Sequence, residues 1–141
     1  EEQYLKISEF RSPQFLQNGP VLFRVRVDNQ GKHFLKAGGK ILIINMFGQK
    51  IGILSVPQQN ILANSSRLYK EIVFPETLLL GPYVAELKMD NISGPAVRTA
   101  FFVLPLKQFS VAAIILIFLL IIKKRIKIRL GRLRQSKEKH R

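Results

Sequence analysis

The side chains that most often perform catalysis or bind metals are few in this chain and far apart. The two histidines are His33 and His140, neither has a second ligand at a metal-binding spacing, and the chain contains no cysteine. Transition-metal sites and thiolate chemistry are therefore not expected. Asp28 and Asp90 each end a strand-like segment, but a calcium site needs more oxygen ligands than two carboxylates supply. Because the sequence also lacks phosphate-binding glycine loops and serine nucleophile motifs, we predict a protein that is not an enzyme and has no cofactor.

The basic residues after Ile122 are the side chains whose spacing indicates a definite chemistry. Ten Lys and Arg residues follow Ile122, against the single acid Glu138. Ammonium and guanidinium groups beside a bilayer attract anionic lipid headgroups, so the predicted partner is the lipid bilayer at its anionic inner leaflet. No aromatic residue accompanies these charges after Phe118, and nucleic acid is therefore not a predicted partner. The predicted membrane-surface site consists of Lys123, Lys124, Arg125, Lys127, Arg129, Arg132 and Arg134.

A run of apolar residues stands directly before this basic segment. Phe109 to Ile122 reads FSVAAIILIFLLII and carries no charge. As a helix these fourteen residues measure about 21 Å, whereas a bilayer core of about 30 Å needs about 20 residues. Extension from Leu104 to Ile126, with the flanking cations reaching outward, gives 23 residues and is enough to span. A helix that is apolar on every face does not suit a globular core, so we predict a single transmembrane α-helix over 105–126.

The distribution of charge predicts the orientation of this helix. Residues 1–107 hold 13 Lys and Arg against 8 Asp and Glu, net +5, whereas the segment from residue 108 carries 10 against 1, net +9. The positive-inside rule then places 127–141 in the cytoplasm as a basic tail and 1–104 outside the cell membrane. Most of the formal charge of +14 is in this interpretation a topology signal.

The apolar residues of the tail predict its conformation. Ile122, Ile126, Leu130 and Leu133 follow spacings of four, four and three, which places them on one stripe of a helix. A basic helix with such a stripe is expected to lie on the inner leaflet. The alternative is that the charges serve only as a topology signal and that the chain is disordered beyond Leu130.

Residues 1–104 show the alternation of β-strands and no helical periodicity. In the clearest segment, Val21–Asp28, valines and Phe23 occupy one face and charged residues the other. Glycine, proline and asparagine fill the links, and Pro57 is expected to end a strand. We predict an all-β, immunoglobulin-like antiparallel β-sandwich in which Tyr83 is either a tyrosine corner or an ordinary core aromatic. The other predicted strands are Tyr4–Phe10, Lys40–Met46, Ile51–Val56, Arg67–Phe74, Tyr83–Asp90 and Ala96–Leu104.

Four stretches of this region resemble a known family. VDNQGKHFLKAGGKILIINMFGQKIGIL, ILANSSRLYKEIVF, GPYVAELKMD and TAFFVLP before a membrane helix are similar to the C-terminal Ig-like domain of the WxL-interacting proteins. These are surface proteins of Gram-positive bacteria, and the absence of disulfides fits such a source. The resemblance covers roughly residues 4–125. It implies the sandwich and the membrane anchor, but the family's upstream binding domain is not in this sequence, so its partner is not carried over. The matching positions are Asn29 with Gly31, Gly39, Gly48, Gly81 with Tyr83, and Pro105.

Three functions are compatible with this organisation. The first is a non-catalytic cell-surface binding or adhesion module that presents the sandwich to a protein or a cell-wall polymer. Its candidate surface is Lys40 to Val56 with Phe47 in the turn, although core packing is the better explanation of that segment. The second is a structural stalk that spaces an upstream domain from the membrane, since we expect the chain to be a mature form or a C-terminal piece of a longer protein. A sorting signal for wall attachment, the third, is rejected because Lys107 and Gln108 replace the threonine and glycine that follow Leu-Pro in such signals.

Overall fold

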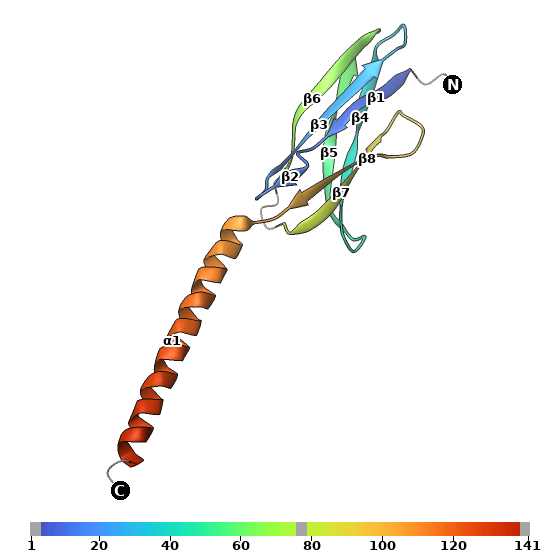
Figure 1. The fold of residues 1–141 in the computed structure, drawn as a ribbon. Helices are drawn as coiled ribbons and strands as arrows, with labels where there is room; N and C mark the ends of the chain where they lie inside the picture. Colours follow the sequence, from blue (N-terminus) through green and yellow to red (C-terminus); the bar gives the residue numbers. More distant parts are fainter. Residues whose placement is uncertain (1–3, 76–78, 139–141) are drawn as a thin grey trace. The chain divides into compact units, whose positions relative to one another are not determined.

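The computed structural model describes residues 4–75 and 79–138, which belong to two compact units that meet in the sequence at Pro105 and Leu106. The first unit contains all the strands and the second is a helix (Figure 1). The elements are β1 (Leu5–Arg11), β2 (Phe15–Leu16), β3 (Val21–Asn29), β4 (Leu35–Asn45), β5 (Lys50–Ile61), β6 (Ser65–Phe74), β7 (Gly81–Met89), β8 (Val97–Val103) and α1 (Leu106–Glu138).

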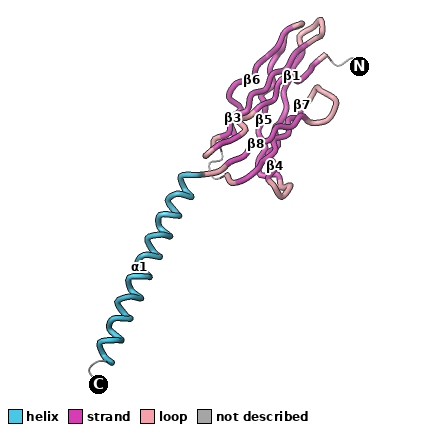
Figure 2. The backbone as a smooth tube through the Cα atoms, in the orientation of Figure 1, coloured by secondary structure: helices cyan, strands magenta, loops and turns pink. Residues whose placement is uncertain are grey.

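The strands form two sheets. The strands, magenta in Figure 2, have the order β1-β3-β6 in one sheet and β2-β8-β7-β4-β5 in the other. All neighbours are antiparallel except β2, which pairs in parallel with the end of β8. The buried side chains of both sheets belong to a single core cluster, so the sheets pack face to face as a sandwich. The prediction of an all-β unit followed by one apolar helix is confirmed at this level.

The core is formed by the alternation visible in the sequence. Along β3 the residues at every second position are buried, from Val21 to Asn29, and β7 alternates in the same way from Tyr83 to Met89. Phe23 is 1% exposed and lies 5.9 Å from the rings of both Phe10 and Phe101. Stacked and edge-on aromatic pairs at such distances stabilise a core beyond the effect of burial alone.

The strand boundaries correct several predictions. β5 does not end at Pro57 but continues to Ile61, because β5 is the edge of its sheet and Pro57 lies beside the bulge between Ala37 and Gly39 of β4. A proline without an amide hydrogen is tolerated at both kinds of position. Residues 11–20, which lie between two predicted strands, contain the short strand β2, and Val97, within the predicted strand Ala96–Leu104, is exposed.

β4 begins at Leu35, earlier than the predicted start at Lys40. The early part of the strand runs through Gly38 and Gly39, residues that favour turns in a sequence-based reading. A side chain at Gly39 would collide with the backbone carbonyl of Lys88 on β7, so glycine lets the two strands approach closely. Glycine therefore belongs to the strand here and does not interrupt it.

One buried hydroxyl connects the two sheets. The Tyr69 side chain on β6 donates a hydrogen bond of 2.7 Å to the carbonyl of Ala37 on β4. Burial raises the pKa of Tyr69, and the nearby positive charge of Arg67 opposes this increase. The hydroxyl is therefore a neutral donor at physiological pH, which satisfies a polar group inside the core.

The strand pairing defines two ends of the sandwich. β8 ends at Val103, opposite Gly81 at the start of β7, and the turn between β4 and β5 lies at the same end. We call this the proximal end, because the chain leaves the sandwich there (Figure 1). The distal end is the opposite one, where Leu5 at the start of β1 pairs with Asn29 at the end of β3.

Replacement of Phe23 by alanine tests this core. A buried phenylalanine truncated to alanine typically costs about 3–5 kcal/mol, a large part of a total stability of about 5–15 kcal/mol. We expect Phe23→Ala in residues 1–105 to lower the midpoint of urea and thermal unfolding strongly. The matched control is Phe34→Ala, since Phe34 is 60% exposed and its loss should change stability by no more than about 0.5 kcal/mol. Coincident melting curves for the Phe23 variant and the unmodified domain would show that the core is misassigned.

Candidate functional site

The helix α1 presents apolar side chains on all sides. Within the described residues it is the one helix long and apolar enough to cross a membrane, over Leu106–Leu133, and every residue of that segment is exposed. These 28 residues measure about 42 Å at about 1.5 Å per residue, more than the roughly 30 Å of a hydrocarbon core. The one polar side chain of the run 109–122 is Ser110, whose hydroxyl donates to the carbonyl of Lys107 at 2.8 Å. The run therefore has no side-chain donor that requires water.

The basic residues predicted as a membrane-surface site all lie on this helix. α1 continues past Ile126 and Leu130 to Glu138 without a break, so the predicted transmembrane segment and the predicted amphipathic segment belong to one helix. Lysine and arginine are good helix formers, and a run of them gives no reason for a helix to stop. The side chains from Lys123 to Arg132 are exposed, and the side chain of Arg134 lies outside the described part of the structure.

The helical geometry separates apolar from basic residues in this segment. At roughly 100° per residue, Ile122, Ile126, Leu130 and Leu133 fall within about 80° of arc. The basic residues occupy the remaining circumference, with Ile128 among them. Such an arrangement can place the stripe against acyl chains while the cations reach headgroup phosphates.

At the distal end of the sandwich, the side chain of Asn29 organises the loops. It is 1% exposed, and its amide nitrogen donates to the carbonyls of His33 at 2.8 Å and Ile61 at 2.9 Å, while its oxygen accepts from the Gly31 amide at 2.9 Å. Asn29 thus joins the β3–β4 loop to the end of β5. A buried amide that is fully hydrogen-bonded fixes the segments that it connects.

These connected segments display three apolar side chains to solvent. Phe34 is 60% exposed, Leu62 is 69% exposed and Tyr4 is 41% exposed. Backbone hydrogen bonds link Gln30 to Tyr4 and Asn64 to Gly31, so the three segments lie together. We call residues 4, 30–34 and 62–64 the distal loop cluster. Sequence reasoning missed this surface because its segments are distant in the chain, although aromatic and leucine side chains within polar links were an available signal.

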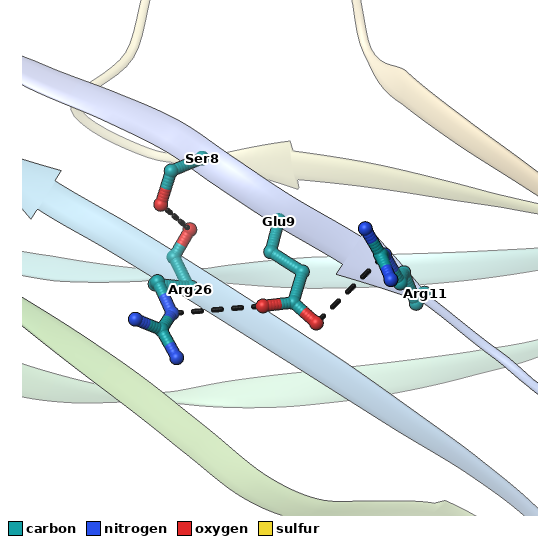
Figure 3. Close-up of polar contacts among 4 residues, drawn as sticks. All are labelled: Ser8, Glu9, Arg11 and Arg26. Carbon is teal, nitrogen blue, oxygen red and sulfur yellow. Dashed lines mark hydrogen bonds and ion pairs between the residues drawn. The ribbon is translucent and has the colours of Figure 1, made fainter.

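The outward face of the three-stranded sheet carries a group of ionic contacts. Glu9 lies between two cations, with 3.6 Å from its Oε2 to Arg26 Nε and 3.9 Å from its Oε1 to Arg11 Nε (Figure 3). Ser8 donates to the backbone carbonyl of Arg26 at 3.4 Å. The arginine partners are exposed and the Glu9 side chain is partly covered, and pairs at a protein surface contribute at most about 1 kcal/mol, so these contacts support the local register more than they form a site. The neighbouring depression of about 430 Å³, which also includes Arg24 and Lys70, is open to solvent.

The predicted candidate surface Lys40–Val56 is the hairpin of β4 and β5. Its inward residues, such as Ile41 and Ile43, belong to the core, whereas Phe47 lies at the tip of the turn and is 78% exposed. The hairpin tip is at the proximal end, so it does not join the distal loop cluster. Across residues 4–75 and 79–138, no three His, Cys, Asp or Glu side chains are grouped as metal ligands.

No family model matches the chain, and no curated protein matches its sequence.

A peptide of residues 122–141 tests the basic segment apart from the rest of the chain. We expect it to gain helix, measured by circular dichroism, on vesicles that contain anionic lipid, and to lose that binding in high salt because screening weakens the attraction. The control carries Ile126→Asn and Leu130→Asn, which keeps every charge but removes the centre of the stripe, and it should remain largely unfolded on the same vesicles. Equal affinity for neutral and anionic vesicles, or binding without helix, would contradict a lipid-lying segment.

Proposed function

We propose that the protein is a single-pass membrane protein in which α1 crosses the bilayer. The observation that carries this proposal is the complete exposure of an apolar helix in a chain whose sandwich closes its own core. A continuous apolar surface of this size is unfavourable in water, whereas in lipid a helix satisfies all its backbone groups internally. Lys107 and Lys123 bracket the apolar run, and their chains are long enough to reach the two headgroup layers.

The orientation in this proposal places the sandwich outside and the basic segment in the cytoplasm. Its support is the charge bias, net +9 from residue 108 onward against net +5 over residues 1–107. The cytoplasmic cations from Lys123 to Arg134 then meet anionic lipid of the inner leaflet.

We further propose that the sandwich is immunoglobulin-like. The strand order and the parallel pairing of β2 with β8 support this class, in which the first strand divides between both sheets. The hydroxyl of Tyr83 accepts from the Leu80 amide at 3.0 Å and donates to the Leu80 carbonyl at 3.1 Å. This is the tyrosine-corner geometry, at the start of the strand where immunoglobulin-like domains have it. The resemblance to the WxL-interacting proteins is consistent with the same class and remains part of the proposal.

The function that these features support best is non-catalytic binding or adhesion at the cell surface. The distal loop cluster combines exposed apolar side chains with a backbone fixed by Asn29, and rigid loops with exposed aromatics are a common basis of recognition. The proposed partner is a protein or a polymer of a cell wall. The distal end is the part of the sandwich farthest along β8 from the anchor, so it is the end proposed to meet this partner.

A structural stalk is the alternative function, and one observation favours it. The chain enters the sandwich at the distal end, beside Asn29, and leaves it at the proximal end after Val103. A spacer between an upstream domain and a membrane requires this in-line arrangement.

Sedimentation with isolated Gram-positive cell walls separates the two functions. The full chain, purified in detergent micelles, is mixed with walls that either have or have not been stripped of protein by protease. We expect binding, and at least about a tenfold loss of affinity for the double variant Phe34→Asp, Leu62→Asp, since truncating a central contact typically costs more than about 1 kcal/mol. Leu22→Asp is the control, because Leu22 is similarly exposed, at 51%, on β3 away from the cluster.

The outcomes assign the partner class. Binding that survives protease treatment of the walls indicates a polymer, and binding that is lost with it indicates a protein. If the unmodified chain binds neither preparation, the stalk replaces the binding module, and equal losses in the double variant and the control would exclude the distal loop cluster as the contact surface.

A further inference from the structure

The turn between β4 and β5 presents its aromatic residue in an unusual way. Phe47 is 78% exposed, and both its neighbours, Met46 and Gly48, are exposed as well. None of the contacts that hold the sandwich core involves this side chain. Met46 and Phe47 together place two large apolar side chains in water at one turn, and adjoining exposed apolar side chains are a feature of interaction surfaces.

Three backbone amides of this turn are hydrogen-bonded within the protein. The Asn45 side-chain oxygen accepts from the amides of Phe47 at 3.0 Å and Gln49 at 2.9 Å, and the Asn45 carbonyl accepts from Gly48 at 3.0 Å. The side-chain nitrogen of Asn45 donates to the side-chain oxygen of Gln49 at 3.0 Å. Gly48 has a φ of +76°, which glycine adopts without strain. These three amides therefore lose little when water is removed.

A second turn at the same end has the same two properties. Leu80 is 55% exposed, and both its amide and its carbonyl are bonded to the hydroxyl of Tyr83. The two turns are adjacent, because a Cβ on Gly81 would lie 3.1 Å from the terminal methyl of Met46. Phe47, Met46 and Leu80 therefore project from one end of the sandwich on backbone that needs few further hydrogen bonds.

The connection to α1 identifies what lies next to this end. Only Leu104 and Pro105 separate the last residue of β8, Val103, from the first residue of α1, Leu106. Three Cα–Cα steps of about 3.8 Å allow at most about 11 Å between Val103 and Leu106. The headgroup region on each side of a bilayer is about 5–8 Å thick. A helix that begins to cross at Leu106 therefore keeps the proximal end within reach of the outer leaflet.

We propose that Phe47, together with Met46 and Leu80, inserts into the interfacial layer of the outer leaflet and docks the proximal end of the sandwich on lipid. This inference rests on the proposed membrane span. Apolar and aromatic side chains are favourable at that depth, and the exposed Lys50 at the start of β5 is placed to meet headgroup phosphates. The sandwich is then held at two points, the covalent link and the turn, so that the distal loop cluster is presented in a restricted range of orientations.

The test uses the absence of tryptophan from the chain. Phe47→Trp introduces a single reporter at the tip, and Phe34→Trp, at an aromatic of comparable exposure on the distal end, is the matched control. Each full-length variant is reconstituted into vesicles with and without lipids brominated near the headgroup. Resistance of the chain to alkaline extraction is measured on the same samples.

The expected result is a blue-shifted emission for the tryptophan at position 47 that brominated lipid quenches strongly, with a red emission and little quenching at position 34. A chain that resists extraction but shows equal, weak quenching at both positions overturns lipid docking and leaves the membrane span intact. A chain that is extracted overturns the span and the docking together. A third outcome is a blue shift at position 47 without quenching, where the shift itself disappears when the protein is diluted in lipid. This outcome shows that the turn contacts a second copy of the chain, and it also overturns lipid docking.

Discussion

The structure depends on one constraint, which is that two apolar surfaces of the same chain must be removed from water in two different ways. The sandwich buries its surface within itself, since residues from both sheets form a single cluster around Phe23. The helix has no such partner, and its side chains from Leu106 to Leu133 remain exposed. Covering a leucine or isoleucine side chain is worth about 1.5–3 kcal/mol, so the total for the helix is on the order of tens of kcal/mol. This imbalance supports the proposal that α1 lies in lipid, and the proposed topology rests on that placement.

The two ends of the sandwich use the same structural device. β3 ends at Asn29 and β4 ends at Asn45, and each asparagine side chain takes the place of water around the following turn. Each turn then displays an exposed phenylalanine, Phe34 at the distal end and Phe47 at the proximal end. Side-chain amides suit this role because they both donate and accept hydrogen bonds. The device is the same, but the covalent link to α1 gives the two phenylalanines different surroundings and, in our proposals, different partners.

Features set by neighbouring residues could be predicted from the sequence, whereas features set by contacts between distant residues could not. The alternation of Val21, Phe23 and Val25 is local, and so is the uninterrupted apolar run of the helix, which is why both were predicted correctly. The path of β5 through Pro57 depends on its edge position and on a bulge in β4, neither of which is visible in β5 itself. The bond from Asn29 to Ile61 spans 32 residues, so the distal loop cluster had no local signature. The helix runs through the predicted membrane boundary at Ile126 to Glu138, because charge marks such a boundary without ending a helix.

Single-cysteine labelling tests the central claim, a helix that crosses the bilayer with the sandwich outside, most directly. The chain has no cysteine of its own, so Ser93→Cys, Ala113→Cys and Ser136→Cys each provide a unique thiol in the sandwich, the apolar run and the basic segment. With a membrane-impermeant maleimide, the account predicts labelling of position 93 on intact cells, of position 136 only after the membrane is permeabilised, and of position 113 only after denaturing detergent is added. Labelling of position 136 on intact cells would contradict the orientation, and labelling of position 113 in native membranes would contradict the span itself.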